Sequence, residues 1–159
     1  MTLNELAKLH HGWVASMNWH NRTYLEALAM IASEIGEAAD EVTLSGVTSH
    51  FALELADVVL RCIDFTELLG LDIEMGLIGH DDKEVAYKPI ERCFLDLNVI
   101  LGKAVNVSRK DDYELLGDYL VRLVAKSFEI AERLGIDLMS AIASKIEINL
   151  ARGSRGRKI

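Results

Sequence analysis

The chain has 159 residues, of which 50% are hydrophobic and 6% aromatic, with a single proline. This length suits one domain with a sizeable core, and a composition so poor in proline favours helices. The formal net charge of −8 argues against a nucleic-acid-binding surface, because phosphate contacts need a basic patch. No apolar run is long enough to cross a membrane, and we expect no signal peptide. Cys62 and Cys93 lie in apolar contexts and are expected to be reduced core residues of a cytoplasmic protein.

Two capping boxes mark the starts of the first two predicted helices. Thr2 pairs with Glu5 and Thr23 with Glu26, a spacing at which each side chain can satisfy the other residue's free backbone N–H. Apolar residues at helical spacing continue the second helix as far as Val42. No segment shows the alternation expected of a strand.

Turn and capping residues divide the rest of the chain. Glycine is favoured just past a helix end, aspartate caps a helix start, and proline suits the first helical position. The predicted boundaries are a turn over 44–48, a helix over 49–69 ended by Gly70, a short helix capped by Asp72, a polar connection over 79–88, a helix from Pro89 to about Val107, one from Asp111 or Asp112 to Gly135, and a last helix from Asp137 to about Ala151. We expect an all-α bundle with short loops over residues 1–152, followed by a basic tail over 153–159.

A faint internal repeat has an offset near 65 residues. Segment 36–38 resembles 102–104, and segment 69–73 resembles 134–138. Chance similarity between amphipathic helices is the alternative. The second copy has other residues where the first has paired acids: Ile100, Lys103, Tyr119 and Arg122.

The paired acids carry the strongest chemical signal in the chain. Glu34 and Glu37 are three residues apart, as are Glu54 and Asp57, so each pair shares a helix face. Two such helices side by side would bring four carboxylates together, and like charges at short range need a cation between them. Oxygen ligands of this kind suit Mg²⁺ or Mn²⁺.

The third predicted helix strengthens this interpretation. Apolar residues surround most of its circumference, as in a buried helix, and its charged residues share one narrow stripe. Acids on a buried helix need partners or a metal. The alternative is a solvated face on which Arg61 pairs with Asp57 or Asp64.

Aromatic and histidine residues give weaker signals. Trp19 lies in the connection 18–22, where an aromatic ring beside an acidic site can stack on a base. Packing of the ring over the end of the bundle is the alternative. The five histidines show no zinc-ligand spacing and are expected on the surface or in loops.

The acid pattern resembles a known family signature. Glu-x-x-Glu, sixteen residues and then Glu-x-x-Asp, here from Glu34 to Asp57, resembles the signature of the MazG-like, all-α nucleoside triphosphate pyrophosphohydrolases, relatives of the dimeric dUTPases. The segment Lys145-x-x-x-Asn149-x-x-Arg152 resembles the C-terminal substrate-binding helix of that family. After Arg152 the chain continues Gly-Ser-Arg-Gly-Arg-Lys, where many members have proline and a His-Gly-Lys tail.

The resemblance implies hydrolysis between the α- and β-phosphates of a nucleotide, which gives the monophosphate and pyrophosphate. The roles that follow are Glu34, Glu37, Glu54 and Asp57 as ligands of Mg²⁺, with Mn²⁺ as a substitute; Glu34, Glu37 or Glu41 as the base that orients water; Lys145 and Arg152 on the phosphates; and Asn149 on the sugar or base. The position of Trp19 in its connection, rather than the resemblance, makes it the candidate to stack on the base. We expect a deoxynucleoside triphosphate as substrate, with a purine slightly favoured, and a homodimer or homotetramer. The alternatives are a pyrophosphohydrolase for another phosphorylated metabolite, such as phosphoribosyl-ATP, and a non-catalytic helical interaction module whose acids only form salt bridges.

Overall fold

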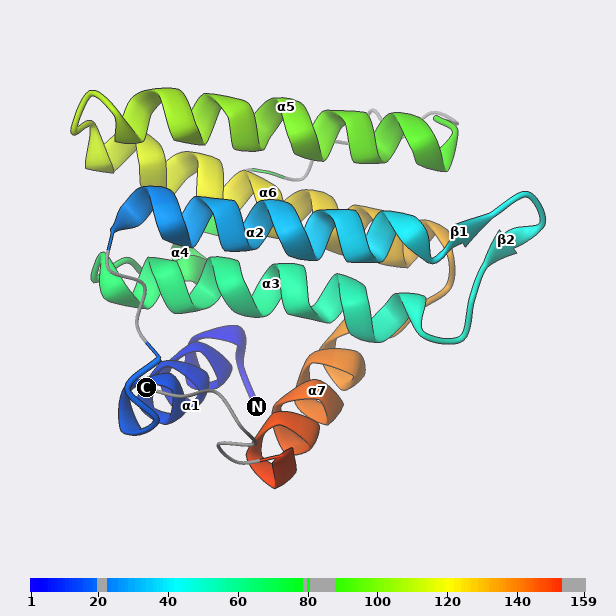
Figure 1. Ribbon diagram of the computed structural model, residues 1–159, viewed down its shortest axis with the longest axis horizontal. Helices are drawn as coiled ribbons and strands as arrows, with labels where there is room; N and C mark the ends of the chain where they lie inside the picture. Colours follow the sequence, from blue (N-terminus) through cyan, green and yellow to red (C-terminus); the bar gives the residue numbers. More distant parts are fainter. Residues whose placement is uncertain (20–22, 79, 81–87, 153–159) are drawn as a thin grey trace.

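The computed structural model describes residues 1–19, 23–78, 80 and 88–152. Four long helices run alongside one another in Figure 1: α2 (Tyr24–Asp40), α3 (Phe51–Leu68), α5 (Ile90–Ser108) and α6 (Tyr113–Arg133). Two more, α1 (Leu3–Ser16) and α7 (Leu138–Arg152), pack on α3, and the short α4 (Ile73–Leu77) contacts α1 and α6. With seven helices in the described residues, the predicted all-α class is confirmed. No helix in this part of the chain is both long and apolar enough to span a membrane.

The predicted helix starts are confirmed by their capping hydrogen bonds. The Thr2 hydroxyl accepts from the Glu5 N–H at 3.2 Å, and the Glu5 carboxylate accepts from the Thr2 N–H at 2.8 Å. Thr23 and Glu26 form the same reciprocal pair. The starts of α4, α6 and α7 are capped by the carboxylates of Asp72, Asp112 and Asp137. Pro89 was predicted as the first helical residue of α5 but is its N-cap, so the helix begins one residue later, at Ile90.

A small hairpin corrects the prediction that the chain has no strands. The helix α2 ends at Asp40, and Val42 belongs to β1 (Val42–Thr43), which pairs antiparallel with β2 (Gly46–Val47). β-Branched residues flank the turn, and Gly46 has a φ of +137° that few other residues adopt. Val42 kept the helical apolar spacing because its side chain packs on the same core, so periodicity alone could not detect the change.

The two halves of the chain share one local architecture. The pair α2–α3 is followed by Gly70 at φ +70°, an Asp72 cap and α4, and the pair α5–α6 is followed by Gly135 at φ +66°, an Asp137 cap and α7. Each glycine occupies the left-handed conformation that ends a helix. These equivalent junctions lie 65 residues apart, which supports the internal repeat over chance similarity.

The helix α3 lies at the centre of the fold. It contacts α1, α2, α6 and α7, and its buried residues surround most of its circumference, as predicted. The charged stripe of α3 is the exception, because Glu54, Asp57, Arg61 and Asp64 are each only partly buried. The packing of α3 therefore places these four charged residues on one strip, and three of them line the cavity described next.

Candidate functional site

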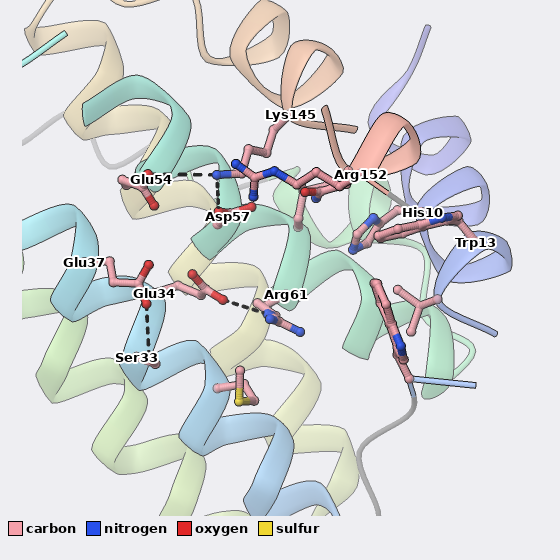
Figure 2. Close-up of a pocket in the computed structure, with 15 residues that line it drawn as sticks. His10, Trp13, Ser33, Glu34, Glu37, Glu54, Asp57, Arg61, Lys145 and Arg152 are labelled. Atoms are coloured by element: carbon pink, nitrogen blue, oxygen red, sulfur yellow. Dashed lines mark hydrogen bonds and ion pairs between the residues drawn. The ribbon is translucent and has the colours of Figure 1, made fainter. Parts of the chain in front are cut away.

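A cavity of about 550 Å³ lies between α1, α2, α3 and α7. Its lining combines carboxylates from α2 and α3, basic side chains from α3 and α7, and aromatic rings from α1 and the segment after it (Figure 2). Eight of the nine site residues predicted from sequence line this cavity: Glu34, Glu37, Glu54, Asp57, Lys145, Asn149, Arg152 and Trp19. The chain thus brings together residues that lie more than 100 positions apart.

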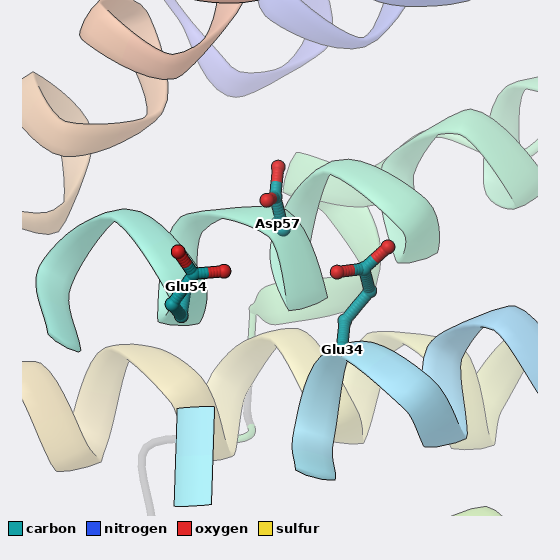
Figure 3. A group of neighbouring side chains, drawn as sticks. All are labelled: Glu34, Glu54 and Asp57. Atoms are coloured by element: carbon teal, nitrogen blue, oxygen red, sulfur yellow. The ribbon is translucent and has the colours of Figure 1, made fainter. Parts of the chain in front are cut away.

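Three of the carboxylates form one cluster, which we call the acidic trio: Glu34, Glu54 and Asp57. Each offers an oxygen atom, and these atoms all lie within 4.8 Å of one another. Glu34 extends from α2 toward the two acids of α3 in Figure 3. Glu34 is 7% exposed, and Glu54 and Asp57 are partly buried. An all-oxygen cluster of this kind is the donor set that a hard divalent cation prefers.

Glu37 lines the same cavity but stands apart from the trio. Its side chain is exposed, and its carboxylate accepts a hydrogen bond from the Ser33 hydroxyl at 3.4 Å. It lies one helical turn from Glu34, on the same helix, as Figure 2 shows. The predicted set of four acids therefore divides into three clustered carboxylates and one separate carboxylate.

Lys145 contacts two of the three acids of the trio. Its Nζ is 2.6 Å from Asp57 Oδ2 and 3.9 Å from Glu54 Oε1, as the dashed lines in Figure 2 show. The residue is 6% exposed, although it was predicted to contact substrate phosphates. In this structure the single positive charge of the ammonium is shared unequally between the two acids of α3, and Asp57 is the closer partner.

Arg61 supplies the second cation of the site. Its Nε lies 2.9 Å from Glu34 Oε1, so the pair joins α3 to α2. The alternative from sequence paired Arg61 with Asp57 or Asp64, but Asp64 instead lies 2.7 Å from His11 Nδ1. Arg61 was not predicted as a site residue, although its place on the charged stripe of a buried helix was the available signal.

The charge balance of the trio leaves Asp57 short of positive charge. The pKa of the Asp57 carboxyl is raised from 3.8 to about 6, chiefly by burial, and the neighbouring carboxylates Glu34 and Glu54 contribute to the same rise. The hydrogen bond and charge of Lys145 oppose this rise and only partly offset it. The cluster therefore favours additional positive charge or a proton.

His10 is a lining residue that the sequence prediction placed wrongly, on the surface or in a loop. It is 5% exposed in α1 and faces the cavity. Its Nδ1 has no hydrogen-bond partner among the described residues. Burial lowers the pKa of the imidazole to about 4, so the ring is neutral at pH 7. His10 lies four residues after Leu6 and four before Val14, and both of these are buried on α1. This helical spacing is the sequence signal that could have revealed the burial of His10.

Two tryptophans form the aromatic wall of the cavity. Trp19 meets Trp13 edge to face, with ring centroids 5.1 Å apart and planes at 84°. Both rings are partly buried and line the cavity. Trp19 thus packs against α1, and its ring also lies in the cavity that holds the acidic trio.

The remaining predicted residues lie at the edges of the site. Asn149 is half-buried and Arg152 exposed, and both line the cavity from the end of α7. Glu41 does not line it, and its carboxylate accepts a hydrogen bond from the Thr48 hydroxyl beside the hairpin. The basic tail 153–159, most of the connection 79–88 and part of the connection 18–22 lie outside the described residues.

Comparison with known proteins gives no family for this chain. No protein-family profile, curated protein or solved structure matches it at a significant level. The residues and geometry of the cavity are therefore the basis on which a function is proposed.

Proposed function

We propose that the chain hydrolyses a nucleoside triphosphate to the monophosphate and pyrophosphate, with Mg²⁺ as cofactor and Mn²⁺ as a substitute. The observation that carries the proposal is the acidic trio in a cavity of about 550 Å³ that also holds basic and aromatic side chains. A volume of this order suits a small-molecule ligand. Phosphoryl transfer depends mainly on positioning and electrostatic stabilisation, for which such a lining is suited.

The chemistry of the donor set fits the proposed cation. Glu34, Glu54 and Asp57 would hold it, since their oxygens lie within 4.8 Å of one another. Mg²⁺ binds oxygen at about 2.0–2.1 Å, so opposite ligands lie about 4.2 Å apart, within reach of small side-chain rotations. Bound there, the cation would neutralise phosphate oxygens and lower the pKa of a bound water.

The other lining residues have roles that their positions support. Glu37, exposed and separate from the trio, is the carboxylate best placed to orient the attacking water. The guanidinium of Arg152 keeps its positive charge and can bind phosphate. Asn149 can form hydrogen bonds with the polar groups of a sugar or base. The hydrogen bond of Glu41 outside the cavity makes it a weaker candidate for the base.

The aromatic wall supports a nucleotide rather than a simple phosphorylated metabolite. Trp13 and Trp19 offer π-surfaces at one side of the cavity, and aromatic side chains bind bases by stacking. We retain a deoxynucleoside triphosphate, with a purine favoured, as the proposed substrate. The acid spacing and the Lys145–Arg152 helix support a MazG-like pyrophosphohydrolase in particular, by resemblance.

Self-association and location are further parts of the proposal. Leu95 and Val99 lie one turn apart on α5, and each is 49% exposed, which supports a homo-oligomer that covers this helix. Cys62 and Cys93 are free, buried thiols, in keeping with the reducing cytoplasm.

A substrate screen tests the proposal directly. The protein is incubated with Mg²⁺ and each canonical or commonly damaged nucleoside triphosphate, in ribose and deoxyribose forms, and pyrophosphate and monophosphate are measured. Phosphoribosyl-ATP is included for the rival metabolite reaction. We expect equimolar release of both products from at least one deoxynucleotide. No release from any nucleotide, together with no binding of Mn²⁺, would instead support a non-catalytic interaction module.

A further inference from the structure

The placement of Lys145 raises a question about how the site binds a cation. Its ammonium lies 2.6 Å from Asp57 and 3.9 Å from Glu54, between two of the three carboxylates that would hold the metal. We propose that the Lys145 ammonium takes the place of the divalent cation when none is bound, and that it leaves the acidic trio when the cation binds. Cation binding would then release a mobile positive charge into the cavity.

Charge counting favours this exchange. The trio carries three negative charges, and Arg61 and Lys145 supply two positive charges. A divalent cation in the same cluster would turn the small negative excess into a positive one, with the ammonium and the cation close together and repelling each other. Both would also compete for the same oxygen lone pairs of Asp57, since an ammonium only donates hydrogen bonds.

Lys145 is better placed to leave than Arg61. Of the three acids, Arg61 forms an ion pair with Glu34, at the α2 side of the trio, through a planar and less mobile group. Lys145 lies between the acids of α3, and its flexible four-carbon stem begins on a separate helix, α7. Rotation of that stem moves the ammonium without any change in the acids or in the helices that carry them.

The open cavity gives the released ammonium a destination. Asn149 is one helical turn beyond Lys145, and Arg152 lines the cavity from the same helix. Moved toward Arg152, the ammonium would add a second cation where a triphosphate needs one. This last step rests on the proposed function, whereas the exchange itself rests only on the ion pairs of Lys145.

Lysine reactivity in the wild-type protein tests the exchange without nucleotide. Reductive methylation is carried out in EDTA and in saturating Mg²⁺, and each lysine is quantified by peptide mass spectrometry. We expect Lys145 to be protected in EDTA and several-fold more reactive in Mg²⁺. Lys126 is the matched control, because it is also largely buried in an ion pair, with Glu129, and lies away from the cavity. Equal protection of Lys145 under both conditions would overturn the proposal.

A calorimetric titration with MnCl₂ gives a second test. Lys145→Met keeps the apolar stem and removes the competing charge, so it should bind Mn²⁺ about tenfold more tightly than wild type, equivalent to about 1.4 kcal/mol. Lys126→Met should bind Mn²⁺ as wild type does. Unchanged or weaker binding by a folded Lys145→Met protein would contradict the exchange. If this variant does not fold, the methylation result decides.

The outcomes distinguish this inference from the proposed function. Both tests use a metal ion alone, so a protein that shows the exchange but hydrolyses no nucleotide would refute only the proposed activity. A protein that releases pyrophosphate but keeps Lys145 protected in Mg²⁺ would refute only the exchange.

Discussion

The Arg61 side chain donates to Glu34 across the contact between α3 and α2, with Nε and Oε1 2.9 Å apart. Glu34 is 7% exposed. Among the residues that the structure describes, Arg61 is the only cation within salt-bridge distance of its carboxylate. The pair joins the two helices whose acids form the trio. Arg61 therefore links the stability of the bundle to the charge of the site.

Replacement of Arg61 by methionine should destabilise the protein chiefly when no divalent cation is present. We expect the free energy of unfolding in EDTA to fall by about 1–3 kcal/mol, because a buried carboxylate loses its partner. Saturating Mg²⁺ should recover most of this loss by neutralising the same carboxylate. Urea denaturation of both proteins, with EDTA or Mg²⁺, measures the effect. An equal loss under the two conditions would show that Arg61 has no connection with a cation site.

The raised pKa of Asp57 predicts a dependence of stability on pH in EDTA. Between pH 3.8 and about 6 the folded protein keeps a proton that the unfolded chain releases. The stabilising contribution is thus complete below the ordinary pKa and is lost as the pH rises through the folded value. The loss amounts to about 3 kcal/mol, at about 1.4 kcal/mol for each pKa unit.

Asp57→Asn isolates this contribution. His10 titrates in the opposite sense over an overlapping range, because burial lowers its pKa to about 4, and this effect is common to both proteins. The free energy of unfolding of the variant minus that of wild type should therefore rise between pH 4 and pH 7. Urea denaturation at several pH values checks it, and a difference that stays constant would show that Asp57 is not desolvated as the structure indicates.

Metal binding to the folded state should raise thermal stability. At a hundredfold excess of Mn²⁺ over its dissociation constant the gain is about 2.7 kcal/mol, which scanning calorimetry detects as a higher Tm. Glu54→Gln removes one charge of the trio and should reduce the shift. A melting curve that does not change across millimolar Mn²⁺ would favour a site held together by salt bridges alone.

The separate position of Glu37 predicts that its role differs from that of the trio. Glu37→Gln should greatly lower turnover, because the base that orients water is lost, yet it should retain Mn²⁺ affinity close to that of wild type. Calorimetry with MnCl₂ and a pyrophosphate assay on the same preparation give the comparison. A parallel loss of metal affinity and turnover would place Glu37 among the ligands, as the sequence pattern first suggested.

Local signals predicted most of the fold and the main site residues. The capping residues Thr2, Thr23 and Asp72 act through neighbours a few positions away, so their effects can be read from sequence. The clustering of Glu34 with the acids of α3 followed from helical spacing and one packed pair of helices. The hairpin was missed because Val42 continued the apolar spacing of α2 while its backbone left the helix.

Partners that depend on three-dimensional packing could not be predicted in the same way. Lys145 shares a buried face of α7 with Ile142 and Ile146, so its burial was detectable by periodicity. Its contact with Asp57 depends on how α7 crosses α3, which no local pattern specifies. The exposed position of Glu37 likewise follows from the rotation of α2 about its axis in the bundle.

Pyrophosphate release by Asp57→Asn tests whether the acidic trio is a catalytic metal site. Wild type is assayed with its best nucleotide in saturating Mg²⁺, beside Asp57→Asn and the control Asp96→Asn, which removes an acid that pairs with Lys88 and Arg92 outside the cavity. We expect kcat/KM to fall at least about a hundredfold in Asp57→Asn, equivalent to about 2.7 kcal/mol of transition-state stabilisation. In the control, kcat/KM should stay within a few-fold of wild type. Turnover by a folded Asp57→Asn protein within a few-fold of wild type would contradict the assignment of the acidic trio as the catalytic metal site.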